Sequence, residues 1–390
     1  MKNVTTIVGA AALALILAAC GTSAAEDGGG GGTTSEEVLA AAQETTEANL
    51  AGTDRDLPTD GPAAQEGKTV WVLACATIAP GCSMAAEGFV EAAGELGWEA
   101  RLADGKLDPS VYNAQIRAAA AAKADAVVLF GVDCAQVKGA VVSAQEAGTK
   151  VFGANALDCD DELSGGGPGD ALLDGDMLWG PDNTDYATFT DDYVGPGQAD
   201  WIIAATDGQA NVIQLRQDDS AGTHHIGKSA HDRLAECAGC TVTVVPYTGE
   251  DLATGRLQAK TSAALQKNLE ADVVLVPVDA AISLGVGSAV DQARASGREL
   301  LLVGQEGVPA SVKLISDGTQ SFALGRPWTW TGWAAADALN RLFAGEEPVD
   351  AGFGFGAMDA EHPPAGETYD GNDDSAPYKD NYRAIWGGGR

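Results

Sequence analysis

Basic residues are scarce in this sequence. Its 390 residues include 23 lysines and arginines against 56 aspartates and glutamates, which gives a formal net charge of -33. Such a chain repels the phosphates of nucleic acids and the headgroups of anionic lipids. We therefore expect no nucleic-acid partner, and we expect the excess negative charge to lie on a surface exposed to solvent.

Material for side-chain catalysis is also sparse. The chain has four histidines, and three of them, His224, His225 and His231, fall in one segment. The Gly-x-Ser-x-Gly motif of hydrolases is absent, and histidine is the usual base of Ser-His-Asp and Cys-His sites. The sequence therefore predicts a protein that is not an enzyme and that needs no cofactor.

Long apolar runs are absent beyond the start of the chain. The run from Val4 to Leu17 is too short to span a bilayer stably and is typical of a signal peptide. It ends in Leu-Ala-Ala-Cys at 17–20, which matches the site where bacterial lipoproteins are cleaved and lipidated. The sequence predicts a signal peptide over 1–19 and a lipid on Cys20, so the protein is expected outside the cytoplasm and anchored to the membrane. The alternative is an ordinary secretory signal beside an unrelated cysteine.

Residues 20–66 are rich in Gly, Ala, Ser, Thr and Glu and include five consecutive glycines, Gly28 to Gly32. They show no sustained apolar pattern beyond one possible short helix, so we expect the lipidated cysteine to be followed by a flexible linker. The remaining stretch, about 320 residues, exceeds what one hydrophobic core usually holds. Two lobes are therefore expected.

Six cysteines follow Cys20, and an even number in an exported chain suggests disulfides. They are Cys75, Cys82, Cys134, Cys159, Cys237 and Cys240. Sequence alone permits fifteen pairings. The Cys-x-x-Cys spacing at 237–240 is also found in redox and metal sites, but no second such pair accompanies it, which favours a local structural disulfide.

Short apolar runs alternate with longer amphipathic stretches from Lys68 onward, which is typical of β-α-β units and parallel sheets. The first series has expected strands at 69–76, 99–103, 125–132 and 150–154, and helices near 84–96, 109–123 and 135–147. The second has expected strands at 211–216, 241–246, 272–278, 300–304 and 320–324, and helices near 225–237, 254–269, 283–296 and 332–344. The predicted fold class is α/β, with two doubly wound parallel-sheet lobes and a Gly-rich insertion at 164–182.

Parallel strands lie side by side, about 4.8 Å apart, so the loops that leave neighbouring strands can reach disulfide geometry. This arrangement predicts a disulfide between Cys134 and Cys159, with Cys75–Cys82 and Cys237–Cys240 as local bridges. Ligands of such sheets bind beyond the carboxyl ends of the strands. The residues at those ends are Thr77 to Cys82, Asp133, Asn155 and Ala156, Ser220 to His225, Asp279, Glu306, and Arg326 to Trp330.

Several short motifs occur in a particular order. Ala85-Ala86-Glu87-Gly88-Phe89 leads to Glu95-Leu96-Gly97, Asp108-Pro109 opens the next helix with Gln115-Ile116 inside it, Asp279 opens a helix after a strand, and Val303-Gly304-Gln305-Glu306-Gly307 is similar to Val-Gly-Phe-Asp-Gly. In this order the motifs resemble the type I periplasmic sugar-binding proteins, the ribose-binding family. The resemblance runs from about residue 68 to about residue 350.

The resemblance implies two lobes that a three-segment hinge joins and that close on a ligand. The N-terminal lobe is expected to comprise 68–190 and 327–347, and the C-terminal lobe and tail 191–326 and 348–390. Some family residues are replaced. The first loop reads Ile78-Ala79-Pro80-Gly81 instead of Asn-x-Pro-aromatic, and the family's Asp-Arg pair is Asn155-Ala156. Fewer hydroxyl-binding groups remain than in a simple pentose or hexose site.

The resemblance and the strand ends together predict a ligand site in the cleft. Its expected residues are Thr77, Ala79, Asp133, Asn155, His224, His225, Asp279, Glu306, Arg326, Trp328 and Trp330. A carboxylate accepts two hydroxyl donors, an Arg donates to oxygens, and an indole face packs on the apolar side of a sugar. The alternatives are that Trp328 and Trp330 only pack the final helix, and that Glu306 is a helix cap.

A phosphate-binding loop is a competing interpretation of Gly222-Thr223-His224-His225-Ile226-Gly227-Lys228-Ser229, which fits the P-loop pattern and follows a strand. The lipoprotein signal argues against nucleotide hydrolysis, because ATP is scarce outside the membrane. Binding of a small anion at this helix N-terminus remains an alternative.

No metal site is predicted. His225 and His231 lie six residues apart, which is not one helical face, and the aspartates of 170–185 lack the order of a calcium loop. We expect this acidic segment, and the acidic tail at 370–374, to be solvated.

The predicted function is capture of a small polar solute, a carbohydrate or polyol, and its delivery to the permease of an ABC transporter. Ligand that contacts both lobes shifts the population toward the closed form. The expected protein is a monomer. The alternatives are a binder of a non-sugar metabolite and a sensor that signals to a membrane receptor.

Overall fold

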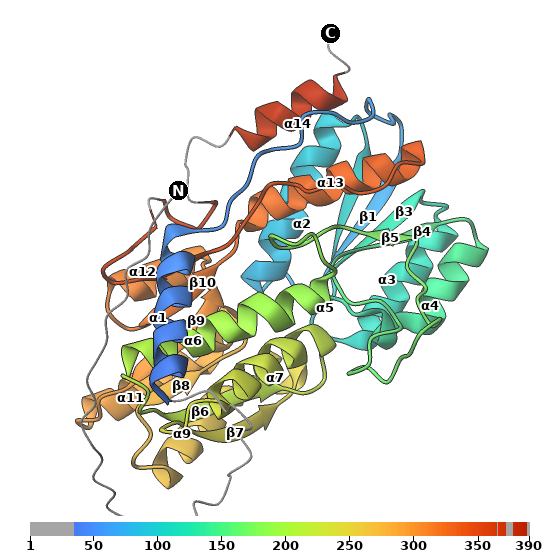
Figure 1. Cartoon of the computed structure of the whole chain (residues 1–390). Coiled ribbons are helices and arrows are strands. Elements are labelled where there is room, and N and C mark those ends of the chain that lie inside the picture. Colours follow the sequence, from blue (N-terminus) through green and yellow to red (C-terminus); the bar gives the residue numbers. More distant parts are fainter. Residues whose placement is uncertain (1–34, 365, 372–376, 388–390) are drawn as a thin grey trace, which may run out of the picture. The chain divides into compact units, whose positions relative to one another are not determined.

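The computed structural model of the chain describes residues 35–364, 366–371 and 377–387 (Figure 1). The predicted signal peptide, the lipidation residue Cys20 and the first part of the predicted linker lie outside these residues. Among the helices of the described part, none combines the length and the apolar character that crossing a membrane requires.

The first sheet has five parallel strands in the order β2-β1-β3-β4-β5. Its strands are β1 (Thr69–Ala74), β2 (Glu99–Asp104), β3 (Ala126–Phe130), β4 (Lys150–Asn155) and β5 (Gly175–Asp176), and its helices are α2 (Pro80–Glu95), α3 (Pro109–Ala121) and α4 (Cys134–Glu146). Every residue of β3 is buried, because helices cover both faces of a parallel sheet. Pro109 starts α3, and Asp108 caps it by accepting a hydrogen bond from the Ser110 N–H.

The second sheet has six strands in the order β11-β10-β9-β8-β6-β7. They are β6 (Asn211–Gln217), β7 (Thr241–Tyr247), β8 (Val273–Leu275), β9 (Leu301–Glu306), β10 (Phe322–Gly325) and β11 (Gly356–Asp359). All neighbours are parallel except β10 and β11, which are antiparallel. The two predicted parallel sheets are thereby confirmed, and β11 adds an edge strand that the sequence analysis did not include.

The helices of the second lobe surround this sheet (Figure 1). They are α5 (Tyr186–Phe189), the π-helix η1 (Thr190–Val194), α6 (Gly195–Ala205), α7 (Ala221–Ala235), α8 (Gly249–Ala253), α9 (Leu257–Lys267), α10 (Asp279–Ala281), the π-helix η2 (Ile282–Val286), α11 (Gly287–Ala295) and α12 (Pro309–Ser316). The sequence analysis missed α6 because its apolar residues do not form one stripe: seven consecutive residues from Gly197 to Ile203 are buried.

The segment expected to be a flexible linker is described from residue 35. Helix α1 (Ser35–Ala51) packs against α6, with Val38 and Ala42 buried. The chain then runs in extended form along α13 (Trp328–Ala344), where Arg341 donates a hydrogen bond to the Asp60 carbonyl. The one short helix that the sequence analysis allowed in this segment is α1, whose few apolar residues are enough to bury one face of a helix that docks on a preformed surface.

Helix α13 packs on α2 of the first lobe at close range. Gly88 and Gly332 make this approach possible: a Cβ on Gly332 would lie 2.2 Å from the Ala85 carbonyl oxygen, and one on Gly88 would lie 2.6 Å from the Thr329 carbonyl oxygen.

The C-terminal helix α14 (Tyr378–Trp386) covers the outer side of α13. Trp330 stacks on Tyr378 with ring centroids 5.0 Å apart, and Trp333 stacks on Trp386 at 5.6 Å. The tail therefore divides between the lobes. Strand β11 joins the second sheet, whereas α14 lies on a helix of the first lobe and not in the second lobe, where the sequence analysis placed the whole tail.

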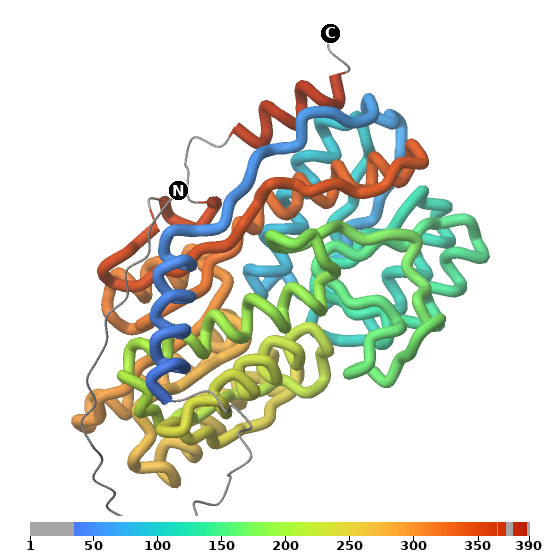
Figure 2. The backbone as a smooth tube through the Cα atoms, viewed as in Figure 1, coloured from blue at the N-terminus to red at the C-terminus, as the bar shows by residue number. Residues whose placement is uncertain are grey.

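Several chain segments cross between the lobes. Three of them lie at 177–185, 325–328 and 345–355. The segment that follows α1 is a further crossing, and Figure 2 shows it running beside the segment that follows α13. The two are bonded through Thr53 N–H to the Phe355 carbonyl at 3.1 Å and through Arg55 to Asp350 at 2.7 Å. We call this pair, 53–56 and 350–355, the hinge ribbon.

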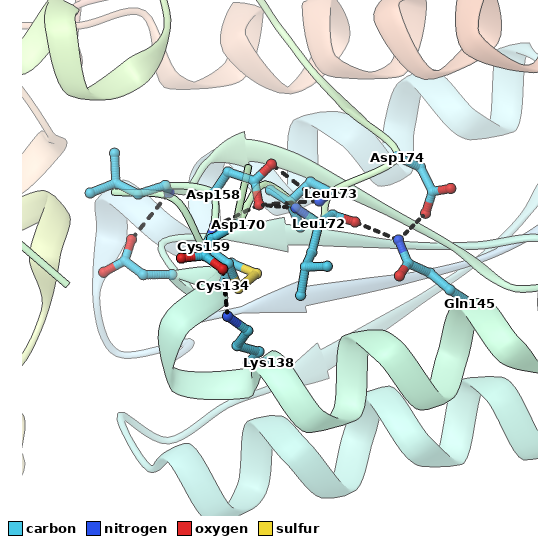
Figure 3. The surroundings of a disulfide bond; sticks show 11 residues. Cys134, Lys138, Gln145, Asp158, Cys159, Asp170, Leu172, Leu173 and Asp174 are labelled. Carbon is cyan, nitrogen blue, oxygen red and sulfur yellow. Dashed lines mark hydrogen bonds and ion pairs between the residues drawn. A yellow bond between two sulfur atoms is a disulfide. The ribbon is translucent and has the colours of Figure 1, made fainter. Parts of the chain in front are cut away.

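The structure contains the three predicted disulfides: Cys75–Cys82, Cys134–Cys159 and Cys237–Cys240. The second of them ties the loop after β4 to the start of α4 (Figure 3). Next to it, the Asp158 carboxylate accepts hydrogen bonds from the N–H groups of Cys159, Leu172 and Leu173. These hydrogen bonds join the Gly-rich insertion to the loop after β4 in the first lobe.

Removal of the Cys134–Cys159 disulfide should lower the free energy of unfolding by about 3 kcal/mol, because the bridge closes a loop with a sequence separation of 25. The measurement is equilibrium denaturation of a double Cys→Ala variant. The matched control is the Cys237/Cys240 double Cys→Ala variant, whose bridge has a sequence separation of 3 and should matter much less. Equal losses in the two variants would contradict the prediction.

Candidate functional site

A cavity of about 100 Å³ lies where the carboxyl ends of the strands of both sheets meet. Loops after β1, β3 and β4 supply the first-lobe wall, and loops after β6, β8, β9 and β10 supply the second. This is the place at which open α/β sheets bind ligands. Of the predicted ligand residues, the following line it: Ala79, Asn155, Glu306, Arg326 and Trp328.

Arg326 is the only cationic residue among those that line the cavity within the described chain. Its guanidinium lies over the Trp328 ring at 4.2 Å and donates to Gln305 Oε1 at 2.6 Å and to the Tyr186 hydroxyl at 3.1 Å. These contacts fix the orientation of the guanidinium. Its Nε is buried and has no hydrogen-bond partner in the described structure, so one directed donor is left over.

Glu306 lies at the end of β9 with a φ of +96°, a conformation that is strained for a residue with a Cβ. One carboxylate oxygen accepts from the Asp279 N–H at 2.8 Å, so Glu306 does cap the short helix α10. The carboxylate also lies against Gly81 of the first lobe: a Cβ there would be 2.0 Å from Glu306 Oε1. Burial, with the negative charge of Asp279, raises the pKa of Glu306. The residue is both a cap and part of the cavity wall.

Two amide side chains on the first-lobe wall have unused acceptors. Asn155 is 5% exposed, and its Oδ1 has no partner among the described residues. Gln136 donates from Nε2 to the Asp219 carbonyl of the second lobe at 2.8 Å, while its Oε1 also has no described partner. Buried acceptors of this kind normally have partners, so both oxygens are unsatisfied within the described structure.

Asp133 was predicted to bind ligand, but the structure places it behind the cavity. Its carboxylate accepts from the Leu157 N–H of its own lobe at 3.3 Å and from the N–H groups of Ala221 and Gly222 at 2.9 Å and 3.3 Å. Burial raises the pKa of Asp133, and these hydrogen bonds act in the opposite direction. Asp133 therefore caps the N-terminus of α7 from across the cleft and joins the two lobes.

Asp279 does not line the cavity either. It is fully buried, and its carboxylate accepts four hydrogen bonds, from Ser311 Oγ at 2.6 Å, Gln305 N–H at 2.9 Å, Gly307 N–H at 3.2 Å and Gln320 Nε2 at 3.2 Å. With every acceptor position used inside the second lobe, Asp279 organises the loop that carries Glu306. None of its acceptor positions is therefore free to bind a ligand.

The remaining predicted residues lie elsewhere. Thr77 is exposed, and its N–H donates to Asp104. Trp330 packs on α14, as the alternative interpretation proposed. His224 is half-buried beside the cavity wall, and His225 is held by two aspartates outside the cavity. A strand-end position is thus not sufficient to place a side chain in the cavity, because a loop can also direct its side chains away from the cavity.

Several lining residues were missed. Tyr112 and Gln136 come from helices, Tyr186 follows the Gly-rich insertion, Gln217 ends β6, and Asp219 lies two residues after it. Asp219 directly precedes the predicted Ser220 to His225 loop, so a loop that started one residue earlier would have included it. Tyr186 has no sequence signal, since only the folding of the insertion brings it to Arg326.

The P-loop pattern does not form a phosphate site of the usual kind. Lys228 lies within α7, with its side chain exposed and its ammonium 2.6 Å from Asp232. Among the described residues, one cluster has metal-ligating spacing, Cys134, Asp158 and Cys159, and both sulfurs belong to the disulfide.

The chain has detectable relatives. A family model described as "Periplasmic binding protein domain" matches residues 72–347. No curated protein sequence matches the chain.

Solved structures of low sequence identity share the fold. A solute-binding protein of an ABC transporter from Agrobacterium vitis, with bound allitol, has 15% identity and a TM-score of 0.60, over 76% of this chain and 96% of that one. A solute-binding protein from Bacillus halodurans with bound myo-inositol has 15% identity and a TM-score of 0.60, over 76% of this chain and 96% of that one. A solute-binding protein from Burkholderia graminis in complex with D-arabinose has 16% identity and a TM-score of 0.61, over 77% of this chain and 98% of that one.

Proposed function

Because the chain belongs to the family that carries the periplasmic binding protein domain, we propose that it captures an uncharged carbohydrate or polyol between its two lobes and delivers it to an ABC transporter. The ligands named for the structures of similar fold are sugars and polyols, which supports this ligand class. In this proposal the protein is a binder and not an enzyme.

The observation that carries the proposal is the set of polar atoms in the cavity. Asn155 and Gln136 line one wall and each has a side-chain oxygen without a described partner, and Arg326 lines the other wall with an Nε that has no described partner. Hydroxyl groups match such a set because each of them both donates and accepts. The face of Trp328 adds an apolar surface for the C–H side of a ring.

The charges of the cavity argue against an acidic ligand. Glu306 and Asp219 line it together with the single cation Arg326, whose guanidinium is already directed to Gln305 and Tyr186. A ligand carboxylate or phosphate would meet two acidic side chains, and a guanidinium that already donates to two partners and has only Nε unpaired. Sugar acids and phosphosugars should therefore bind much more weakly than neutral polyols.

The location and the partner are further parts of the proposal. The lipoprotein signal at 1–20 supports a mature protein that a lipid on Cys20 anchors outside the cytoplasmic membrane. In the proposed cycle the protein acts as a monomer, and the closed lobes present the ligand to the permease.

A thermal-shift screen of the mature chain against neutral sugars, polyols, sugar acids, nucleosides and amino acids tests the function. Neutral sugars or polyols should raise the melting temperature, because a ligand that binds only the folded state stabilises it by mass action. A shift confined to amino acids or sugar acids would contradict the proposed ligand class.

Replacement of Asn155 by Leu, which has a similar volume, should weaken binding of the screened ligand by about tenfold, since one neutral hydrogen bond in a buried site contributes about 1 to 1.5 kcal/mol. The free energy of unfolding should not fall, because Oδ1 has no partner in the described protein to lose. Titration calorimetry and thermal melting separate the two effects. A variant that binds normally would remove Asn155 from the site.

A further inference from the structure

His225 connects the two lobes outside the cavity. Its Nε2 lies 2.6 Å from Asp161 Oδ1, and its Nδ1 lies 2.9 Å from Asp191 Oδ2. The side chains of His225 and Asp161 are 9% and 6% exposed, so this contact is shielded from water. We call these three residues the His225 bridge.

The two carboxylates belong to different lobes. Asp161 follows β4, two residues after Cys159, whose disulfide to Cys134 fastens this loop to α4 of the first lobe. Asp191 lies on η1, which continues directly into α6 and packs on α7, the helix that carries His225. The Nδ1 contact therefore lies within the second lobe, and the Nε2 contact spans the two.

The geometry requires a doubly protonated ring. An ionised carboxylate only accepts, so an imidazole can bond two of them only if both nitrogens carry hydrogen. Burial lowers the pKa of His225, but the hydrogen bonds to Asp161 and Asp191 outweigh it and raise the pKa to about 9. At neutral pH the ring is therefore an imidazolium, and each contact is a charge-assisted hydrogen bond.

Several charged and titratable groups surround His225. The hollow beside it is lined by Asp158, Asp160, Glu162, Asp176 and Asp185, β6 contributes Arg216 and Asp218, and its own helix contributes His224, Lys228 and Asp232. Burial raises the pKa of Asp176 to about 6, and burial lowers the pKa of His224. The titrations of Asp176 and His224 therefore lie below the range between pH 7 and pH 10.

We propose that the His225 bridge is a proton-dependent latch, which holds the lobes closed while both ring nitrogens are protonated and releases them when one proton is lost. After that loss one carboxylate faces a nitrogen lone pair, so the bridge changes from attraction to repulsion. The bridge and the ligand stabilise the closed form separately, because none of the three residues of the bridge lines the cavity.

The direction of the pH dependence follows from the raised pKa. A group whose pKa is higher in the closed form than in the open form stabilises the closed form, and this stabilisation is lost as the pH rises through about 9. The closed-to-open ratio should therefore fall by at least about fivefold between pH 7 and about pH 10.

Spin labels on opposite lobes test the latch without any ligand. Val142 of α4 and Leu269 after α9 are 38% and 73% exposed, so labelled cysteines at these positions should not disturb the fold. The distances between the labels are measured at pH 7 and at about pH 10 in the otherwise unchanged chain, in His225→Gln and in Asp161→Asn. His224→Gln is the matched control, since His224 is the neighbouring histidine outside the bridge.

The unchanged chain and His224→Gln should lose their short-distance population as the pH rises, whereas His225→Gln and Asp161→Asn should lack that pH dependence. Distance distributions that are the same in all four chains at both pH values would overturn the proposal. A second readout is the NMR titration of the histidine ring that disappears in His225→Gln. Its pKa should be near 9 and should drop in Asp161→Asn; a pKa below 7 in the unchanged chain would also overturn the proposal.

Discussion

Replacement of Arg326 by Ala should weaken ligand binding by about a hundredfold. The side chain is 2% exposed, and the change removes the unpaired Nε donor together with the cation that lies over Trp328. Hydrogen bonds to charged groups contribute about 1.5 to 3 kcal/mol each, and about 1.4 kcal/mol corresponds to a tenfold change in affinity. The loss also leaves Gln305 Oε1 and the Tyr186 hydroxyl without their donor, which enlarges the effect.

Titration calorimetry with the screened ligand measures this loss, and two further variants make it specific. Arg326→Lys keeps a charge but not the planar fork that bonds Gln305 and Tyr186 together, so it should recover only part of the affinity. Lys228→Ala should bind like the unchanged protein, because Lys228 is exposed and paired with Asp232. If Lys228→Ala abolished binding while Arg326→Ala bound normally, the phosphate-loop interpretation would be favoured instead.

Replacement of Asp279 by Ala should lower the free energy of unfolding by about 4 kcal/mol or more. The carboxylate is fully buried and accepts four hydrogen bonds, so its removal leaves four buried donors without an acceptor. Each unsatisfied buried group costs about 1 to 3 kcal/mol, less where the neighbouring loop can relax or water can enter. Gly304 packs directly on this carboxylate, so the structure cannot collapse into the space without moving β9.

Denaturant unfolding monitored by circular dichroism gives this free energy. The matched control is Asp317→Ala: its carboxylate is exposed and its partner is Lys313 on the same helix. Exposed ion pairs contribute little, so this variant should change the free energy by less than about 1 kcal/mol. If the two variants lost equal stability, the hydrogen-bond network of Asp279 would not hold the second lobe together.

The sheets could be predicted from the sequence because each strand is a local apolar run. Runs such as 125–132 and 272–278 leave no other way to bury their side chains than a sheet covered on both faces. The disulfide between Cys134 and Cys159 followed from the same reasoning, since both cysteines leave neighbouring strands. Helices α1 and α14 could not be predicted with the same ease, because what stabilises them is a docking surface made by distant residues.

The site was predictable only in part, for a related reason. Strand ends indicate a position in the sheet but not the direction of the side chain, so Asn155 and Arg326 face the cavity while Asp133 and Asp279 face backbone N–H groups. From the sequence alone, a carboxylate at a strand end is equally compatible with facing the cavity and with accepting hydrogen bonds from backbone N–H groups. The decision depends on which donors the neighbouring loops direct toward it.

The hinge ribbon has a kinetic consequence. Thr53 and Arg55 bond one connecting segment to the other, so the two cannot bend independently when the lobes separate. A hinge of two segments bonded side by side resists twisting more than a single segment does, and we expect it to limit the opening to one axis. Ligand should therefore enter and leave through one rim of the cleft, and its residence time should depend on residues such as Asp350, which does not line the cavity.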